Sequence, residues 1–600
     1  MTKVLRFFPA LLLMAAVSCA HREATDPVAA LSARNYSIVI PDVATSPERS
    51  AALELALTLN RITGEALPVV TESQAKTPRA IYVGKCKRSE EIAPIDYAEL
   101  GVDGIRLYSK GGDLVLTGGK RGTVYAVFAF LQNYAGCRWF AEDCVVIPEQ
   151  PDLRLPEIDV TYVPPLEYRH CNYVCARDFR FAVANMENGQ NIPEEWGGRV
   201  VYNGFVHTFL DLVPLNVYAA THPEYYAEVD GKRVLTRQTQ LCLTNPDVLK
   251  VVIEAVKKRL RQTPDAIVSV SQTDNNDYYC RCKACTELAE AEGSQSGPMI
   301  HFVNAVARAV KDEFPNAAID TLAYGYTRKP PLHVKAEPNV IVRLCSIACC
   351  FSHPMESDSG PNVSFREDLK KWGECCRRLY VWDYIINYKH MALPFPNFHT
   401  IGPNIRFLIR NHVTSIFEEA NHFCRGGEFE HLRCYIALKC LWDPDFDVEK
   451  GVREFTDAYY GAAAPFIRDY IDLMTRHVVD RKNVHMRIYG IPEQHFDDRA
   501  LMDRALAYFA EAERAAADDP VRLARVQGAK LPVLYTRLCL YMDEEPARGE
   551  MLREFETIAR RYQNFRVAER AERTLEWWLE EMRKPQPAPD APKPPWRIPY

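Results

Sequence analysis

Three acidic residues each follow directly after a short apolar stretch of the kind that forms a buried parallel strand. Asp274 follows residues 268–273, Asp383 follows residues 379–382, and Glu418 follows residues 414–417. In a barrel of parallel strands, the reacting groups lie at the strand ends that face one mouth. A pair of carboxyl groups can hydrolyse a glycosidic bond, because one protonates the leaving oxygen while the other attacks or activates water. We therefore expect Asp274 as the acid, with Asp383 and Glu418 as base or nucleophile.

Each of these acids also has a purely structural interpretation. A carboxylate at a strand end can cap the strand or pair with a cation such as Arg343 or Arg378. Side chains alternate between the two faces of a strand, so a phase error of one residue exchanges each acid for a neighbour. In that case we expect Glu419 and Asp277 in the site instead.

Aromatic and histidine side chains accompany the same strand ends. An aromatic ring can stack on the apolar face of a sugar while its hydroxyl or indole N–H group offers a hydrogen bond. The candidates for binding a sugar are Tyr324, Tyr326, Trp382, Tyr384 and Tyr388, together with His170 and His207. The alternative is that these side chains pack in the core or at its rim.

Three cysteines follow Asp274 in the pattern C-x-C-x2-C, at Cys280, Cys282 and Cys285. With Cys242 they could supply the four thiolates of a tetrahedral structural zinc site. In an exported protein they could instead form disulfides that hold the loop after Asp274, or they could remain reduced thiols. The sequence leaves these alternatives open. Catalysis by carboxyl groups requires no cofactor in any of them.

Helices and strands alternate around these residues. Asn245 is a typical N-cap, Pro246 occupies the first helical turn, and apolar residues from Leu249 to Leu260 share one helix face. This alternation is typical of an α/β fold with parallel strands. We predict a central (β/α)8 TIM-type barrel, of which seven strands are evident in the pattern. They lie at residues 167–173, 200–208, 266–273, 318–324, 340–347, 378–382 and 413–417.

The whole chain, 600 residues long, exceeds what a single hydrophobic core can hold. Short strands and helices precede the barrel, whereas only helical patterns follow it. The expected class is α/β, with a small N-terminal α/β domain, the barrel and a C-terminal α-helical region. The expected bounds are a signal peptide at 1–19, the N-terminal domain at 30–160, the barrel at 165–447, the helical region at 448–583 and a proline-rich tail at 584–600.

The charge and the N-terminus limit the possible partners. Lys and Arg number 73 against 79 Asp and Glu, a net charge of −6 without a long basic run, so we expect no nucleic-acid partner. Lys3 and Arg6 precede an apolar run at residues 7–17 that is too short to span a bilayer and is typical of a secretory signal. The following A-V-S-C resembles a bacterial lipoprotein box with Cys19 as the lipidated residue. We expect an exported lipoprotein of the cell envelope, in the periplasm or outer membrane, held at the membrane by this lipid anchor. The alternative is a soluble exported protein.

Longer motifs carry a resemblance to known families. Residues 118–140 (G-G-K-R-G-T-V-Y-A-V-F-A-F-L-Q-N-Y-A-G-C-R-W-F) resemble the small α/β domain that precedes the barrel of bacterial α-glucuronidases and β-hexosaminidases. Downstream motifs resemble the DUF4838 family, exported bacterial proteins that look like glycoside hydrolases. These motifs include Q-L-C-L-T-N-P at 240–246, D-T-L-A-Y-G-Y-T-R-K-P-P at 320–331 and R-L-C-S-I-A-C-C-F-S-H-P at 343–354. The resemblance to α-glucuronidases implies one acid from a mid-barrel strand and two carboxylates from later strands.

The expected function is that of an exported glycoside hydrolase-like protein. It would act by carboxylate general acid/base catalysis on O-glycosidic bonds of a glycan or oligosaccharide that contains uronic-acid or hexosaminide units. The alternative is a non-catalytic carbohydrate-binding surface lipoprotein that keeps the barrel without the chemistry. Carboxyl groups about 5 to 10 Å apart across one pocket support hydrolysis, and scattered acids support binding alone.

Overall fold

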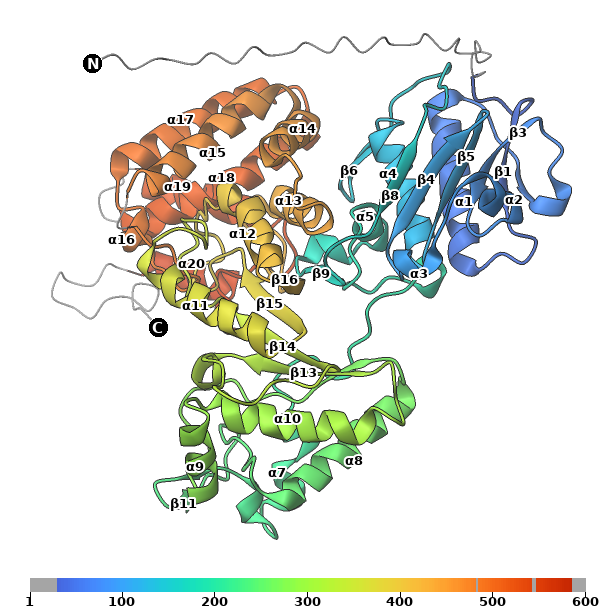
Figure 1. The fold of residues 1–600 in the computed structure, drawn as a ribbon. Coiled ribbons are helices and arrows are strands. Elements are labelled where there is room, and N and C mark those ends of the chain that lie inside the picture. Colours follow the sequence, from blue (N-terminus) through green and yellow to red (C-terminus); the bar gives the residue numbers. More distant parts are fainter. Residues whose placement is uncertain (1–29, 482–483, 542–546, 585–600) are drawn as a thin grey trace, which may run out of the picture.

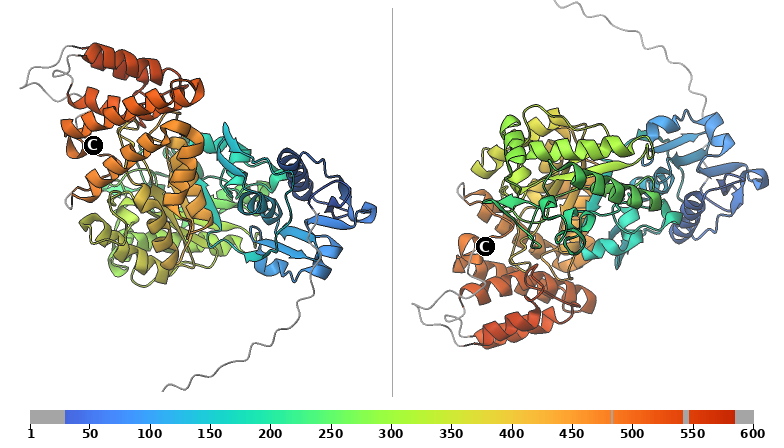
Figure 2. Two further views of the ribbon diagram at one scale, coloured as in Figure 1. Left: turned by 90° about the horizontal axis from the view of Figure 1, so that it is seen from above. Right: turned by 90° about the horizontal axis from the view of Figure 1, so that it is seen from below.

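A computed structural model describes residues 30–481, 484–541 and 547–584. The predicted signal peptide, the lipidation site Cys19 and nearly all of the proline-rich tail lie outside the described residues. Figure 1 shows an N-terminal sheet with its helices in blue, a central sheet in green and yellow, and a group of helices in orange and red. In the two views of Figure 2, the N-terminal part and the C-terminal helices lie on opposite sides of the central sheet.

The N-terminal part is a six-stranded mixed sheet in the order β2-β1-β3-β5-β4-β8. Strands β4 and β5 form a hairpin whose turn residues Gly111 and Gly112 have φ angles of 62° and 90°, which favour glycine. Helices α1 and α4 pack against each other beside this sheet. The strands are β1 (Tyr36–Ile40), β2 (Val69–Thr71), β3 (Arg79–Val83), β4 (Ile105–Lys110), β5 (Asp113–Gly118) and β8 (Asp159–Tyr162), and the helices are α1 (Ser46–Thr63), α2 (Lys87–Ile92), α3 (Tyr97–Leu100) and α4 (Gly122–Asn133).

Between this sheet and the centre of the chain lies the hairpin of β6 (Arg138–Ala141) and β7 (Cys144–Val146). A buried carboxylate joins the two parts. Asp103 of the N-terminal part pairs with Arg169 of the central sheet at 3.0 Å and accepts a hydrogen bond from Asn188 Nδ2 at 2.8 Å. The two parts are therefore held together by polar contacts that water does not reach.

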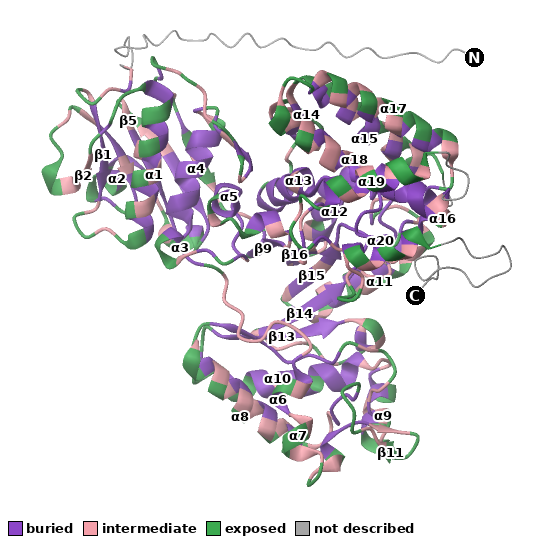
Figure 3. Cartoon of the chain, turned by 180° about the vertical axis from the view of Figure 1, so that it is seen from behind, coloured by how far each residue is buried: buried purple, intermediate pink, exposed green. Residues whose placement is uncertain are grey.

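The central sheet, within the described residues, has six strands in the order β12-β13-β14-β15-β16-β9, and every neighbouring pair is parallel. Figure 3 shows strands β13 to β15 as buried along almost their whole length. Such double burial explains why apolar residues predominate in these strands without a regular alternation with polar ones. The strands are β9 (Tyr168–Cys171), β12 (Ile267–Ser269), β13 (Ala318–Ala323), β14 (Val340–Cys345), β15 (Arg378–Tyr384) and β16 (Val413–Glu419).

The predicted strand at 200–208 is wrong in extent, because only Tyr202 forms a parallel bridge, to Ile267 of β12. Gly204 and His207 have positive φ angles, which interrupt an extended strand. Backbone hydrogen bonds nevertheless continue around this side, from Val200 N to Asn188 O and from Asn188 N to Arg169 O of β9. The sheet is thus a curled parallel sheet completed by irregular segments, and the described residues form six of its expected eight regular strands.

The helices of the central part cover the outer face of this sheet. The N-cap predicted for α8 is confirmed, since Asn245 accepts hydrogen bonds from the backbone N–H groups of Asp247 and Val248. The helices are α5 (Phe179–Ala184), α6 (Phe209–Leu212), α7 (Leu215–Tyr218), α8 (Pro246–Gln262), α9 (Lys283–Ala291), α10 (Ser296–Val310), α11 (Gly360–Cys375), α12 (Phe398–Arg410) and α13 (Glu430–Trp442), and the small hairpin is β10 (Glu228–Val229) with β11 (Lys232–Arg233).

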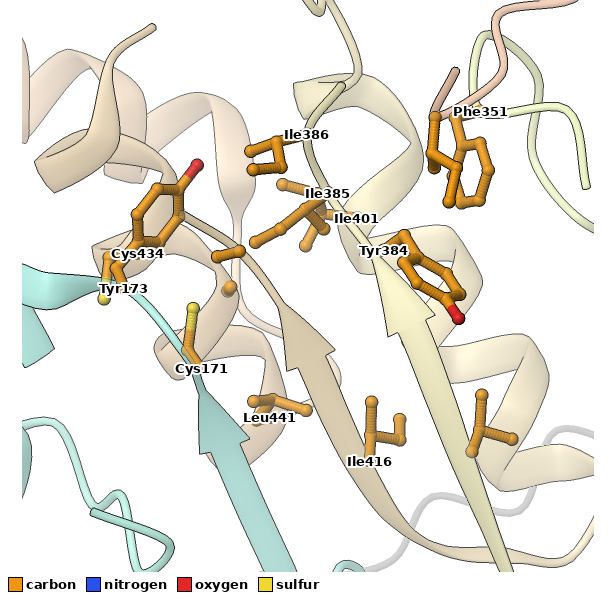
Figure 4. Close-up of a cluster of buried hydrophobic side chains, with 14 of the residues drawn as sticks. Cys171, Tyr173, Phe351, Tyr384, Ile385, Ile386, Ile401, Ile416, Cys434 and Leu441 are labelled. Carbon is orange, nitrogen blue, oxygen red and sulfur yellow. The ribbon is translucent and has the colours of Figure 1, made fainter. Parts of the chain in front are cut away.

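Side chains alternate across the sheet, and this alternation determines which acids can reach the mouth. In Figure 4, Cys171 of β9 and Ile416 of β16 point toward α13, where Cys434 and Leu441 lie. Phe417, the next residue of β16, belongs to the separate cluster that fills the inside of the curled sheet. Residues 416 and 418 therefore face the helices, whereas residues 417 and 419 face the inside.

After α13, the described regular elements are helical, as the sequence predicts. Helices α15 and α17 pack together, and α17 packs on α18. Among the helices of the described residues, none combines the length and apolar composition that crossing a membrane requires. The helices are α14 (Val448–Tyr460), α15 (Ala464–Val479), α16 (Pro492–His495), α17 (Arg499–Ala515), α18 (Pro520–Leu540), α19 (Arg548–Ala559) and α20 (Leu575–Arg583).

Candidate active site

A cavity of about 340 Å³ opens at the C-terminal ends of the central strands. This is the edge where parallel α/β sheets place their binding sites. Its wall is mainly aromatic, and three carboxyl groups line it. The lining residues used below are Asp274, Glu419, Glu569, His207, His422, Tyr324, Trp382, Tyr384, Tyr388 and Tyr489.

Glu419 is the last residue of β16 and lines this cavity. The indole Nε1 of Trp382, on the neighbouring strand β15, donates a hydrogen bond to Glu419 Oε2 at 2.6 Å. The pKa of Glu419 is raised to about 8, and burial is the largest cause. The Trp382 hydrogen bond lowers this pKa, whereas the charges of Glu569 and Asp274 raise it further. Glu419 is therefore mostly protonated at neutral pH, the state that a general acid requires.

Asp274, predicted as the acid, lies in the loop after β12 and lines the cavity. Its side chain is 65% exposed. The Tyr324 hydroxyl donates a hydrogen bond to Asp274 Oδ1 at 3.0 Å, and His207 Nε2 lies 3.9 Å from the same oxygen. The tyrosine thus orients a solvent-accessible carboxyl group in the cavity that the more buried Glu419 also lines.

Asp383 and Glu418, the other two predicted acids, do not line the cavity. They are paired across β15 and β16 and are 3% and 1% exposed on the helix-facing side. Burial raises the pKa of Asp383 to about 6, although the Ser346 hydroxyl donates a hydrogen bond to it. Burial and the nearby Asp383 raise the pKa of Glu418 well above its usual value. The one-residue alternation therefore brings Glu419, and not Glu418, into the cavity.

Most of the predicted sugar-binding residues reach the cavity, and two do not. Trp382, Tyr324, Tyr384, Tyr388 and His207 all line it. Tyr326 instead stacks on Tyr279, with ring centroids 5.0 Å apart. His170 is buried beside Glu187, with Nδ1 3.6 Å from Oε1, and burial lowers the pKa of His170 to about 4.

Sequence reasoning missed two residues that the C-terminal helical region contributes. Tyr489 and Glu569 both line the cavity. Burial raises the pKa of Glu569, a hydrogen bond from Tyr489 lowers it, and the charge of Asp274 raises it. Glu569 N donates to Tyr388 O at 2.9 Å, which attaches this segment to the mouth. Glu569 lies in a run of alternating charges, E-R-A-E-R, which carries no local signal of a binding role.

Within the described part of the chain, two groups of side chains have the donor atoms for a metal. The sulfur atoms of Cys242, Cys280, Cys282 and Cys285 all lie within 4.8 Å of one another, and the four thiols are free. A second group consists of Cys350, His353 and His485. The first group matches the four cysteines that the sequence selects.

Two family models match the chain. The model described as "Domain of unknown function (DUF4838)" matches residues 139–472, which is more than half of the sequence. The model described as "Glycosyl hydrolase family 67 N-terminus" matches residues 23–130. Both agree with the resemblances found in the sequence. Compared with curated proteins, the sequence matches none.

Among solved structures, a GH115 4-O-methyl-α-glucuronidase with specificity for decorated arabinogalactans is 12% identical, with a TM-score of 0.59 over 93% of this chain and 80% of that chain. A GH138 enzyme targeting pectin rhamnogalacturonan II is 11% identical, with a TM-score of 0.47 over 91% and 98% of the two chains. A family 89 glycoside hydrolase from Clostridium perfringens is 11% identical, with a TM-score of 0.45 over 86% and 65%. At 12% identity, the likeness to the GH115 structure concerns the fold alone, and it supports a mixed α/β fold.

Proposed function

Since this chain belongs to the DUF4838 family, a family of unknown function, its chemistry must be inferred from its own site, and we propose that it is a glycoside hydrolase. The observation that carries the proposal is the presence of two carboxyl groups with different surroundings in one aromatic cavity. Glu419 keeps a proton at neutral pH, and Asp274 is solvent-accessible and oriented by Tyr324. Two carboxyl groups in different environments are what acid and base roles require.

The two groups divide the reaction between them. Glu419 donates its proton to the departing glycosidic oxygen, and Asp274 supplies the carboxylate that attacks the anomeric carbon or removes a proton from water. These roles replace the sequence-based expectation that Asp274 is the acid. Trp382, Tyr384 and Tyr388 provide apolar surface against which a pyranose ring can stack.

The charge of the cavity favours a sugar without a carboxylate. Asp274, Glu419 and Glu569 line it, and its described lining residues include neither Lys nor Arg. A uronate would bring a further negative charge to this site without a cationic partner, which is unfavourable in a partly buried cavity. Of the two substrate classes expected from the sequence, the hexosaminide class therefore fits better than the uronic-acid class.

The decisive experiment is turnover of a panel of aryl glycosides that includes hexosaminides, neutral hexosides and uronides. We expect hydrolysis of a hexosaminide or neutral hexoside and a loss of about 10²- to 10⁴-fold in kcat for both Glu419→Gln and Asp274→Asn. Asp277→Asn, in the same loop but outside the cavity lining, is the matched control. If the wild type binds glycans but hydrolyses none of them, the result would contradict the hydrolase proposal and support the non-catalytic carbohydrate-binding protein.

Two broader assignments belong to this proposal. The curled parallel sheet and the irregular segments around Asn188 and Tyr202 together represent an incomplete (β/α)8 barrel. The protein is exported and anchored by an acylated Cys19, as the residues before it suggest. Metabolic labelling with a fatty acid should mark the wild type and not Cys19→Ser, and equal labelling of both would contradict the anchor.

A further inference from the structure

The four cysteines Cys242, Cys280, Cys282 and Cys285 form a compact group away from the cavity. Cys242 precedes α8, Cys280 precedes α9, and Cys285 lies in the first turns of α9. Figures 1 and 3 show α9 next to β11 at the outer end of the part that also contains α8 and α10. Two segments that are distant in the sequence, one before α8 and one at the start of α9, therefore meet at these sulfur atoms.

We propose that this group binds one zinc ion through all four cysteine sulfur atoms. The distance from Cys242 Sγ is 3.7 Å to Cys282 Sγ and 4.0 Å to Cys285 Sγ. Four thiolates around zinc, each with a Zn–S bond of about 2.3 Å, place their sulfur atoms about 3.8 Å apart in a tetrahedron. All four sulfur atoms lie within 4.8 Å of one another, so the group has the size of a filled tetrathiolate site.

The hydrogen bonds around the sulfur atoms suit negatively charged thiolates. The backbone N–H of Glu228 donates to Cys280 Sγ at 3.3 Å, and Arg233 Nη1 lies 3.9 Å from the same atom. The Thr244 hydroxyl lies 3.2 Å from Cys285 Sγ. A zinc ion with four thiolates has a net charge of −2, and such outer donors stabilise that charge.

The packing of this region gives a physical reason for a metal. Ala227, Cys242, Cys280 and Cys285 form a small buried cluster of their own, separate from the large core of the central part. So few apolar side chains contribute little hydrophobic stabilisation, and small units of this kind commonly use a metal in place of a core. Four ligands leave no open coordination position, so the ion is structural and does not react with a substrate.

The site would hold the loop that carries Asp274. Gln240 forms hydrogen bonds to this loop on both sides of Asp274. The backbone N–H of Thr273 donates to Gln240 Oε1 at 2.9 Å, and the backbone N–H of Gln240 donates to Tyr278 O at 3.2 Å. Cys242 and Cys280 continue these two segments into the cysteine group. A bound ion therefore ties both ends of the loop to one point and restricts its movement.

The test is the metal content of the full chain, purified without chelator from zinc-supplemented cells. We expect about one zinc per chain in the wild type and in the control Cys375→Ser, and almost none in Cys285→Ser. Titrating the native wild type with a mercurial reagent should release the zinc as the four thiols are modified. This second measurement does not depend on whether the variant folds. Replacement by Co²⁺ should produce the absorption of a tetrahedral cobalt thiolate.

Three results would overturn the proposal. The first is the absence of metal together with a mass, after alkylation of the unreduced protein, that shows these cysteines protected from the reagent as disulfides. The second is the absence of metal with all four thiols freely alkylated. The third is stoichiometric iron in place of zinc, which a tetrahedral sulfur site can also bind.

Discussion

At the scale of single residues, Glu419 differs from an ordinary surface glutamate in its surroundings. It is partly enclosed by the aromatic wall and accepts the indole hydrogen bond of Trp382. Burial, together with the charges of Glu569 and Asp274, raises its pKa to about 8, while the indole hydrogen bond lowers it. Because protonated Glu419 is the active form in the proposed reaction, the pH dependence of the reaction reports its pKa directly.

The first prediction is therefore an alkaline limb in the profile of kcat/KM against pH. The titration of Glu419 should leave kcat/KM constant below about pH 8 and should lower it tenfold per pH unit above that pH. Trp382→Phe removes the hydrogen bond that stabilises the charged form, so the limb should move upward by about one pH unit. A limb that does not move, or that moves downward, would contradict the role of Glu419 as acid.

The second prediction separates Glu418 from its neighbour. Glu418 faces the helices, so Glu418→Gln should retain kcat/KM within a few-fold, whereas Glu419→Gln should lose it. The pKa of Glu418 is raised in the folded protein, so its contribution to stability is complete below pH 4.5 and is lost as pH rises through its folded value. The Gln variant should accordingly show a smaller decline of the free energy of unfolding toward alkaline pH. A loss of activity equal to that of Glu419→Gln would contradict the position of Glu418 on the helix-facing side of β16.

At the scale of elements, the inside of the curled sheet contains a buried ion pair below the cavity. Arg343 of β14 and Asp320 of β13 lie 2.8 Å apart, and both are almost fully buried. The guanidinium group also lies over the rings of Tyr202, Phe205 and Trp382. The pair thus connects two neighbouring strands to the aromatic wall that holds Glu419.

The third prediction concerns this pair. Asp320→Asn leaves the Arg343 charge buried without its partner, which should lower the free energy of unfolding by about 3 to 5 kcal/mol. Glu91→Gln breaks the exposed pair with Arg88 and should change it by less than about 1 kcal/mol. Urea unfolding followed by circular dichroism measures both. A change below 1 kcal/mol for Asp320→Asn would mean that the aromatic rings alone accommodate the arginine.

At the scale of the whole molecule, the cavity is built from parts far apart in the sequence. The central strands contribute Glu419 and Trp382, and the C-terminal region contributes Tyr489 and Glu569. The C-terminal segment is attached by backbone hydrogen bonds, from Tyr388 N to Ile488 O at 2.7 Å and from Met391 N to Val567 O at 2.8 Å. The helical region is therefore part of the site and not a separate appendage.

The fourth prediction tests this long-range contribution. The charge of Glu569 raises the pKa of Glu419, so Glu569→Gln should move the alkaline limb downward by about half a pH unit. This direction is opposite to that of Trp382→Phe. Glu572→Gln, in the same segment but outside the cavity lining, is the control and should leave the limb in place. An unchanged limb in Glu569→Gln would place this residue outside the electrostatic reach of the acid.

The sequence alone determined the class of fold and the region of the site, because these depend on local patterns. Apolar stretches followed by acids identified the strands that end at the mouth, and the spacing of the cysteines selected the four that meet. Family resemblance added the DUF4838 assignment and the glucuronidase-like N-terminal part, and the family models agree with both.

Only the tertiary structure decided which acids share the cavity. A strand that is buried on both faces has no polar and apolar alternation, so its sequence does not reveal which of Glu418 and Glu419 points inward. The same ambiguity applied to Asp383, whose neighbours Trp382 and Tyr384 line the cavity instead. Glu569 lies about 150 residues beyond β16 and reaches the mouth through contacts that form only when the chain is folded. Local sequence patterns cannot predict this tertiary contact, because it depends on how the helical region packs against the central sheet.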